Sequence, residues 1–168
     1  MSFSAADHEF MARAMALTQN GRNSATPNPS VGCVVVKNAR IIGEGWHEKA
    51  GQAHAEVNAL KACSEDARGA TVYVTLEPCA HHGRTPPCSA SLIAAGVARV
   101  VAALKDPNPK VAGTGLAALQ AARGSGQIRR KTRRVMLRKR QGSSRLKSDS
   151  QVADVSNSRR RTKAEPRQ

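Results

Sequence analysis

Aromatic residues are scarce in this chain of 168 residues, which has two Phe, one Trp and one Tyr, and none of them lies in residues 123–168. Single-stranded nucleic acids are held largely by stacking of their bases on aromatic rings, so this absence argues against a base-stacking surface there. Apolar runs are short as well. No stretch reaches the roughly 20 residues that a helix needs to cross a bilayer, so we expect no membrane partner.

Cysteines are also few, with four in the chain, all before residue 89. Their number and spacing do not indicate a disulfide framework. The first 20 residues contain acidic side chains and have amphipathic spacing, in place of the basic start and apolar run of a secretory signal. We therefore predict a protein of the reducing cytoplasm, in which Cys33 and Cys63 are ordinary buried thiols.

Acidic residues are scarce in one part of the chain only. Residues 1–122 hold 11 Lys/Arg and 9 Asp/Glu, whereas residues 123–168 hold 16 and 3, so most of the net charge of +15 lies at the C-terminal end. This end has few apolar residues and cannot bury enough surface to offset its ordering entropy. We predict one domain, residues 1–122, followed by a basic, disordered tail, residues 123–168, that binds polyanions nonspecifically.

A possible metal site is the strongest chemical signal. His54-Ala55-Glu56 is followed by Pro78-Cys79 and then by Cys88. One imidazole and two thiolates are zinc ligands that leave the fourth tetrahedral position open to water, whose pKa zinc lowers from about 15.7 towards 7. Glu56 could carry the proton of that water to a substrate. Hydrolytic removal of an amino group from a heteroaromatic ring needs this set.

Each part of the set also has a simpler interpretation. His-x-Glu triplets are common, and Cys79 and Cys88 could be two buried thiols. The predicted elements favour the metal site, because His54 should open a helix, Cys79 should follow a strand, and Cys88 should lie in the first turn of a second helix. The positive end of a helix dipole stabilises thiolates against protonation.

The order of predicted elements is typical of an α/β fold. Helices are expected from the capping box at residues 4–7 to a stop at Gly21, and over 53–67 and 88–95; strands are expected over 31–36, 41–47, 71–76 and 98–104. The first two strands should form a hairpin through the turn 37–40, and the pattern then becomes β-α-β. In open α/β sheets ligands collect beyond the carboxyl ends of strands, where residues 77–79 and 105–108 fall.

Four segments together carry a family resemblance. Residues 26–32 (Thr-Pro-Asn-Pro-Ser-Val-Gly), 54–56, 76–88 and 105–113 resemble the deaminase domain of the bacterial riboflavin biosynthesis proteins, and the match covers residues 7 to about 122. The segment 76–88 is the specific one. Nucleic-acid and nucleoside deaminases usually place two residues between their cysteines, and here eight intervene.

The resemblance implies a cytidine deaminase-like three-layer α/β/α sandwich with a mixed sheet. It also implies hydrolysis of the 2-amino group of 2,5-diamino-6-(5-phosphoribosylamino)pyrimidin-4-one to give 5-amino-6-(5-phosphoribosylamino)uracil and ammonia. The implied cofactor is Zn2+, held by His54, Cys79 and Cys88, with Glu56 as the proton carrier. Positions that match the family's substrate pocket are Asn28, His47, His81, Arg84, Asp106 and Asn108. The expected partners are this small-molecule pyrimidine ribose phosphate and further copies of the chain in a homo-oligomer.

The substrate positions have alternatives of their own. The Asn28 amide, between two prolines, could read a pyrimidine edge or serve a turn. The Arg84 guanidinium could clamp a phosphate or be solvated. Asp106 and Asn108 could bind ribose hydroxyls, and Asp-Pro-Asn-Pro is also a turn sequence.

The resemblance ends at about residue 122. In that family the helix equivalent to residues 116–122 leads into a further strand and then into an NADPH-dependent reductase domain. Neither has a counterpart in residues 123–168, so we expect a sheet without its last strand, no reductase activity, and a truncated or out-of-frame product. Two other hypotheses stay open at this point. One is a tRNA or other nucleic-acid base deaminase that uses the basic tail; the other is an inactive zinc-binding protein.

Overall fold

The computed structural model describes residues 3–82, 86–109 and 111–124. The elements are α1 (Ala5–Leu17), the 3-10 helix η1 (Thr18–Gly21), β1 (Gly32–Lys37), β2 (Arg40–Trp46), α2 (Ala55–Lys61), β3 (Thr71–Leu76), α3 (Cys88–Ala94), β4 (Arg99–Leu104) and α4 (Thr114–Gly124). No helix in this part of the chain has the length and hydropathy needed to cross a membrane. Residues 125–168 lie outside the described ranges, so the disorder and the polyanion binding of the tail stay predictions.

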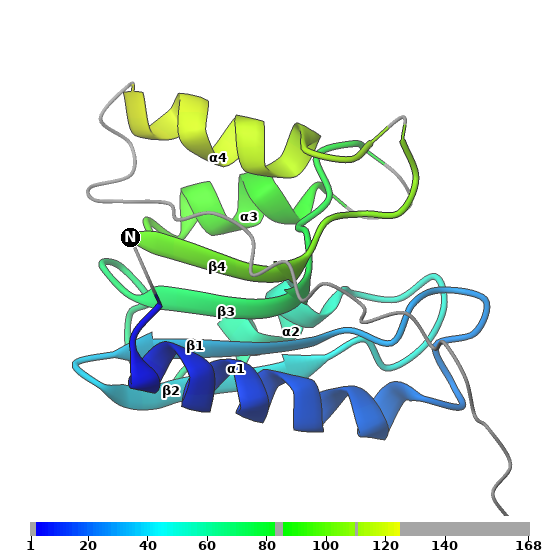
Figure 1. Ribbon diagram of the computed structural model, residues 1–168, viewed down its shortest axis with the longest axis horizontal. Coiled ribbons are helices and arrows are strands. Elements are labelled where there is room, and N and C mark those ends of the chain that lie inside the picture. The colour runs from blue at the N-terminus through cyan, green and yellow to red at the C-terminus, as the bar shows by residue number, and fades with distance from the viewer. Residues whose placement is uncertain (1–2, 83–85, 110, 125–168) are drawn as a thin grey trace, which may run out of the picture. The chain divides into compact units, whose positions relative to one another are not determined.

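One mixed sheet connects the strands in the order β2-β1-β3-β4 (Figure 1). β1 is antiparallel to both β2 and β3, whereas β3 and β4 are parallel, with Val72 opposite Val100. The predicted hairpin and β-α-β unit are confirmed, and each strand lies within one residue of its predicted bounds. The parallel pair brings the carboxyl ends of β3 and β4 to one edge of the sheet.

Helices cover both faces of the sheet and complete the predicted three layers (Figure 1). Side chains alternate along the strands, so Val34 and Val36 face α1 while Cys33 and Val35 face the opposite side. The α1 face also contains Met11, Ala14, Leu17, Tyr73, Val101 and Ala103. The opposite face packs against α2, α3 and α4 through Ala55, Ala59, Leu92, Leu116 and Leu119. The described residues hold these four strands and no fifth.

The Asp7 carboxylate ties α1 to the sheet. The predicted capping box is present, because the Asp7 amide donates to Ser4 Oγ at 3.2 Å and the Ser4 amide donates back to Asp7 Oδ2 at 3.0 Å. Asp7 also accepts from the Tyr73 hydroxyl at 2.7 Å and from both terminal nitrogens of Arg99, at 2.6 and 3.0 Å. Helix α1 is thereby fixed to β3 and β4.

The prediction of a helix over 53–67 is wrong at both ends, since α2 begins at Ala55 and ends at Lys61. Past the helix, the Ser64 amide donates to the Ile42 carbonyl of β2 at 2.8 Å. Asp66 Oδ1 then accepts from the Arg68 amide at 2.9 Å. The Ile42 carbonyl and the Asp66 side chain thus bind the backbone N–H groups of Ser64 and Arg68, which a longer helix would need for its own hydrogen bonds. Helical periodicity in the sequence reveals neither of these bonds. In contrast, α4 is longer than the predicted 116–122.

Candidate active site

The three predicted metal ligands lie at the ends of three different elements. His54 is the N-cap of α2, Cys79 follows β3 by three residues, and Cys88 is the first residue of α3. His54 Nδ1 lies 3.2 Å from Cys88 Sγ and 3.7 Å from Cys79 Sγ. All three donor atoms lie within 4.8 Å of one another. The predicted placement of these residues at helix starts and a strand end is confirmed.

This donor set fits zinc. Bonds of about 2.3 Å to sulfur and 2.0 Å to nitrogen in a tetrahedron place ligand atoms about 3.5 to 3.8 Å apart, close to the two distances observed here. Hydrogen bonding from Cys88 and His54 lowers the pKa of Cys79 to about 4. The neighbouring Cys79 sulfur and burial raise the pKa of Cys88. Both sulfurs can therefore be thiolates together only with a cation between them, and zinc would supply it.

The cysteine side of the site is held together by backbone bonds. The Cys88 amide donates to Cys79 Sγ at 3.3 Å, and the Ser89 amide donates to the Cys79 carbonyl at 3.1 Å. These bonds join the loop after β3 directly to the first turn of α3. The two sulfurs are consequently positioned with respect to each other by the chain itself.

Glu56 lies in the first turn of α2, two residues after His54, and is 3% exposed. Burial raises the pKa of its carboxyl group. Helix α2 lies very close to β2, because a Cβ built at Gly45 would stand 2.3 Å from the Ala59 amide nitrogen and 2.6 Å from the Ala55 carbonyl oxygen. The absence of a side chain at Gly45 therefore lets α2 approach the sheet and sets the depth of Glu56.

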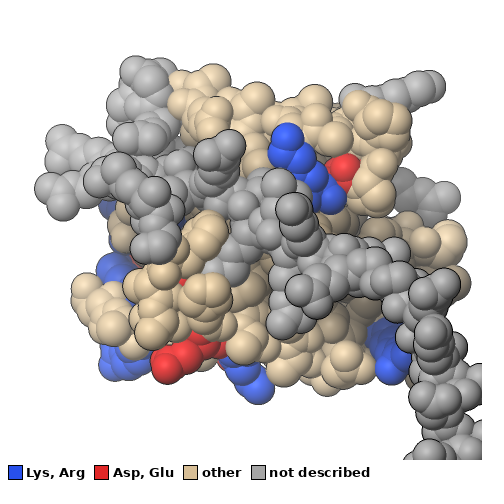
Figure 2. Space-filling model, viewed as in Figure 1, with Lys and Arg blue, Asp and Glu red and all other residues tan. Residues whose placement is uncertain are grey.

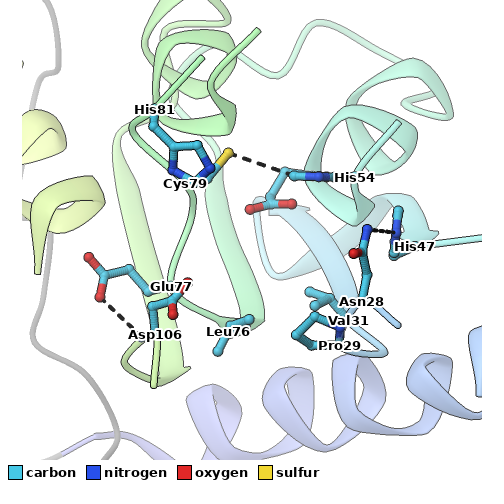
Figure 3. A pocket seen from close by; sticks show the side chains of 11 residues that line it. Asn28, Pro29, Val31, His47, His54, Leu76, Glu77, Cys79, His81 and Asp106 are labelled. Carbon is cyan, nitrogen blue, oxygen red and sulfur yellow. Dashed lines mark hydrogen bonds between the residues drawn. The ribbon is translucent and has the colours of Figure 1, made fainter. Parts of the chain in front are cut away.

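A cavity of about 270 Å³ adjoins these groups (Figure 3). It is lined by Asn28, Pro29, Val31, His47, His54, Glu56, Leu76, Glu77, Cys79, His81 and Asp106. The lining joins the loop before β1, the end of β2, the start of α2 and the loops that follow β3 and β4. The carboxyl ends of the parallel strands β3 and β4 are thus part of the site, as predicted from the position of residues 77–79 and 105–108 directly after two strands.

Two polar residues of the cavity orient each other. His47 is buried, with Nδ1 3.1 Å from the Ala53 carbonyl oxygen and Nε2 3.1 Å from Asn28 Nδ2 (Figure 3). A carbonyl oxygen only accepts, so Nδ1 carries the proton and Nε2 accepts from the Asn28 amide group. The Asn28 carbonyl oxygen is then available as an acceptor for a ligand in the cavity.

The other predicted substrate residues have different placements. His81 and Asp106 line the cavity. Asn108 lies in the same loop as Asp106, and its amide donates to Asp106 Oδ1 at 2.8 Å, but it is not among the described residues of the lining. Arg84 lies outside the described residues, so its phosphate contact stays a prediction.

Sequence reasoning missed Glu77, which is 5% exposed and binds four backbone amides of the segment that leads from β4 into α4. The available signal was an acidic residue next to a buried strand and two residues before a metal ligand. Its partners are 29 to 39 residues away and contribute only backbone groups. No pattern of side chains in the sequence could identify them.

The chain matches a protein-family model described as "Cytidine and deoxycytidylate deaminase zinc-binding region" over residues 4–104. It is 64% identical to the riboflavin biosynthesis protein RibD of Escherichia coli (strain K12) over 116 residues, which are 69% of this chain and 32% of that relative. It is 56% identical to the diaminohydroxyphosphoribosylamino-pyrimidine deaminase of Buchnera aphidicola subsp. Acyrthosiphon pisum over 107 residues, which are 64% of this chain and 73% of the relative. The chain thus spans about a third of the RibD relative and about three quarters of the shorter one.

Solved structures agree with the sequence matches. Acinetobacter baumannii RibD, form 1, superposes with a TM-score of 0.70 at 53% identity and covers 76% of this chain and 35% of that chain. The dCMP deaminase from the cyanophage S-TIM5 has a TM-score of 0.57 at 23% identity, covering 79% of this chain and 100% of that one. The latter likeness concerns the fold alone and confirms the predicted sandwich.

Proposed function

The chain belongs to the cytidine and deoxycytidylate deaminase family, among the diaminohydroxyphosphoribosylaminopyrimidine deaminases, and on this premise we propose its reaction. It hydrolyses the 2-amino group of 2,5-diamino-6-(5-phosphoribosylamino)pyrimidin-4-one: a bond forms between C2 and the oxygen of water, the bond between C2 and the exocyclic amino nitrogen breaks, and ammonia leaves. The observation that carries the proposal is the cluster of His54, Cys79 and Cys88 beside a cavity that Glu56 also lines. The proposal concerns deamination alone and assigns no reductase step to this chain.

Zinc held by these three residues would lower the pKa of a bound water to about 7 and so supply the nucleophile. Glu56 has the complementary role of moving protons. Its carboxylate accepts a proton from the water and delivers it to a ring nitrogen, and then accepts the proton of the newly formed hydroxyl group and passes it to the departing amine. A buried carboxyl group with a raised pKa suits this role, because burial disfavours its charged form and so strengthens its hold on the proton that it carries.

Recognition of the substrate is assigned to residues on opposite sides of the cavity. The Asn28 carbonyl oxygen, oriented through His47, accepts from an amino group of the pyrimidine. His81 and Asp106 lie in the loops after β3 and β4 and face the ribose and its phosphate. We assign the 5′-phosphate to Arg84, whose guanidinium can donate two parallel hydrogen bonds, and a ribose contact to Asn108.

The alternative of a nucleic-acid deaminase is not favoured. The relatives above are named for pyrimidine deamination and riboflavin biosynthesis. On the part of the face in Figure 2 that is not covered by grey atoms, the visible Lys and Arg side chains of the described residues stand apart from one another. A second copy of the chain and polyanions bound by the tail stay predictions.

The experiment that tests this function measures ammonia release by the zinc-loaded protein, with the pyrimidine phosphate and with RNA side by side. We expect release from the pyrimidine phosphate only. Glu56→Gln should retain one zinc per chain while turnover falls by about 100-fold or more, because its amide cannot carry a proton. Glu65→Gln, at a surface ion pair with Arg40, is the control and should keep normal turnover. Near-normal turnover by Glu56→Gln would remove Glu56 from the mechanism, and release from RNA alone would overturn the substrate.

A further inference from the structure

A buried acidic side chain beside the site has no part in the proposed chemistry. Glu77 is the first residue after β3 and precedes the ligand Cys79 by two positions. Its amide donates to the Leu104 carbonyl at 2.9 Å and so continues the parallel pairing of β3 with β4. Its backbone is therefore fixed by the sheet, and its carboxylate extends from a rigid point.

The carboxylate collects four backbone N–H groups from one segment. Oε2 accepts from the amides of Asp106 at 3.4 Å and Gly113 at 2.8 Å. Oε1 accepts from the amides of Gly115 at 3.1 Å and Leu116 at 3.2 Å, both in the first turn of α4. The first pair lies at the two ends of the loop 106–113, so one side chain closes this loop and also caps the helix that follows it.

The tethered loop carries part of the cavity wall. Asp106 lines the cavity, and its Oδ1 accepts from the Asn108 amide at 2.8 Å. The start of α4 also presses on the chain beside the metal ligand, because a Cβ at Gly115 would lie 1.7 Å from the Pro78 carbonyl oxygen. The position of Asp106 relative to Cys79 therefore depends on the hydrogen bonds of Glu77 to this segment and on the packing of Gly115 against Pro78.

In Figure 3 the Glu77 carboxylate points away from Cys79 and His54 and towards the Asp106 backbone. Its oxygens are already engaged by four donors, so it cannot serve as a second proton carrier for the ring. We propose that Glu77 is a positioning residue, which holds the 106–113 loop against the cavity and thereby sets the affinity for the ribose phosphate portion of the substrate. This inference rests on the function proposed above.

The test is Glu77→Gln. Glutamine keeps the length of the side chain but turns one acceptor into an N–H2 group that faces two backbone N–H donors, so two of the four bonds are lost. In the zinc-loaded protein, well below its melting temperature, we expect KM for the pyrimidine phosphate to rise about tenfold or more, since loss of positioning weakens productive binding. Zinc content and kcat should change by less than about threefold, because the lost contacts bind the substrate and the transition state equally well.

A double-mutant cycle separates positioning from general destabilisation. If Glu77 acts through the Asp106 loop, Glu77→Gln should raise KM by less than about twofold when Asp106 is already Ala. Additive effects on KM would overturn the proposal, as would a loss of kcat or zinc with KM unchanged. Glu65→Gln is the control for loss of a surface carboxylate and should leave KM unchanged.

Amide hydrogen exchange gives a second readout that does not depend on the reaction. Protection of the Gly113, Gly115 and Leu116 amides should fall in Glu77→Gln, while that of the β1 amides should persist. Unchanged protection would disprove the tether. If the wild type released no ammonia from the substrate, the proposed function would fail, yet the exchange data would still decide the role of Glu77. Should Glu77→Gln not fold, Glu77→Asp, which shortens the side chain by one methylene, replaces it with the same expected changes in KM and exchange.

Discussion

Replacing Asp7 with Asn tests how α1 is held on the sheet. The substitution keeps the size of the side chain but removes the negative charge that Arg99 approaches at 2.6 and 3.0 Å. Burial and the bond to Asp7 raise the pKa of Tyr73 to about 12, so the Tyr73 hydroxyl remains a donor throughout the neutral range. In the variant the guanidinium of Arg99 stays in a largely buried place without its counter-charge. We expect a loss of stability much larger than at a surface ion pair.

The expected magnitude follows from the burial of the pair. Removing one partner of a buried ion pair costs about 3–5 kcal/mol. The side chains of Asp7 and Arg99 are 6% and 20% exposed. Because the arginine can partly reach water, we expect the lower value, about 3 kcal/mol. With about 4 °C per kcal/mol for a domain of this size, Tm should fall by about 12 °C.

A matched control lies on the surface. Glu44 also accepts two hydrogen bonds of 2.6 Å from one arginine, Arg13, but the two side chains are 28% and 50% exposed. Such exposed pairs contribute about 0–1 kcal/mol, so Glu44→Gln should shift Tm by about 4 °C at most. Both variants are measured by thermal and urea unfolding. If Asp7→Asn lowers Tm no more than Glu44→Gln does, the burial argument is wrong.

The pH dependence provides an independent check on the same carboxylate. The hydrogen bonds from Arg99, together with those from Ser4 and Tyr73, lower the pKa of Asp7. The unfolded chain, with a pKa of about 3.9, therefore binds the proton first as the pH falls. The stabilisation is fully present above that pKa and is lost as the pH falls through the lower folded value. The difference in unfolding free energy between wild type and Asp7→Asn should be constant at neutral pH and shrink below about pH 4; a difference independent of pH would contradict this account.

Three further predictions concern the site and the tail. Cys88→Ala should lose the zinc of the purified protein by metal analysis, and a variant that keeps its full zinc content would remove Cys88 from the ligand set. Gly45→Ala should destabilise the fold by about 2 kcal/mol or more and lower the zinc content, because both close neighbours of the new Cβ are backbone atoms of α2. Gly69→Ala is its control, since Gly69 has φ +80° but no atom within 4 Å of a Cβ, so only its stability should fall. Deletion of residues 125–168 should leave kcat and KM within about twofold while abolishing salt-sensitive retention on heparin, and a loss of activity would restore a functional role for the tail.

The strands and the clustering of His54, Cys79 and Cys88 could be predicted from the sequence, because both depend on local patterns. Short apolar runs, bounded by turn residues, defined the strands of the hairpin and of the β-α-β unit to within one residue. His54, Cys79 and Cys88 were identified by residue type and by the helix and strand ends on which they fall, and the structure brings them together.

The end of α2 and the role of Glu77 could not be predicted, since both depend on distant backbone groups. The Ser64 amide leaves the helical path for the Ile42 carbonyl, 22 residues earlier in the chain. The bond between Asn28 and His47, which orients the Asn28 amide, likewise spans 19 residues. Such bonds exist only once the sheet has formed.

The placement of His54 and Glu56 in one helical turn has a consequence for how the site responds to deformation. Any rigid displacement of α2 moves the proposed ligand His54 and the proposed proton carrier Glu56 together, so their mutual geometry survives. Cys79 and Cys88 form a second unit, joined by their own backbone bonds. Helix α2, which carries the first unit, packs on β1 and β2, whereas Cys79 of the second unit follows β3, the neighbour of β4. The pairing of β1 with β3 therefore joins the two halves of the sheet that carry the two units. A shift between β1 and β3 would change the distances from His54 to Cys79 and Cys88 before it changed the geometry between His54 and Glu56. Metal affinity should therefore respond to a distortion of this fold earlier than proton transfer does.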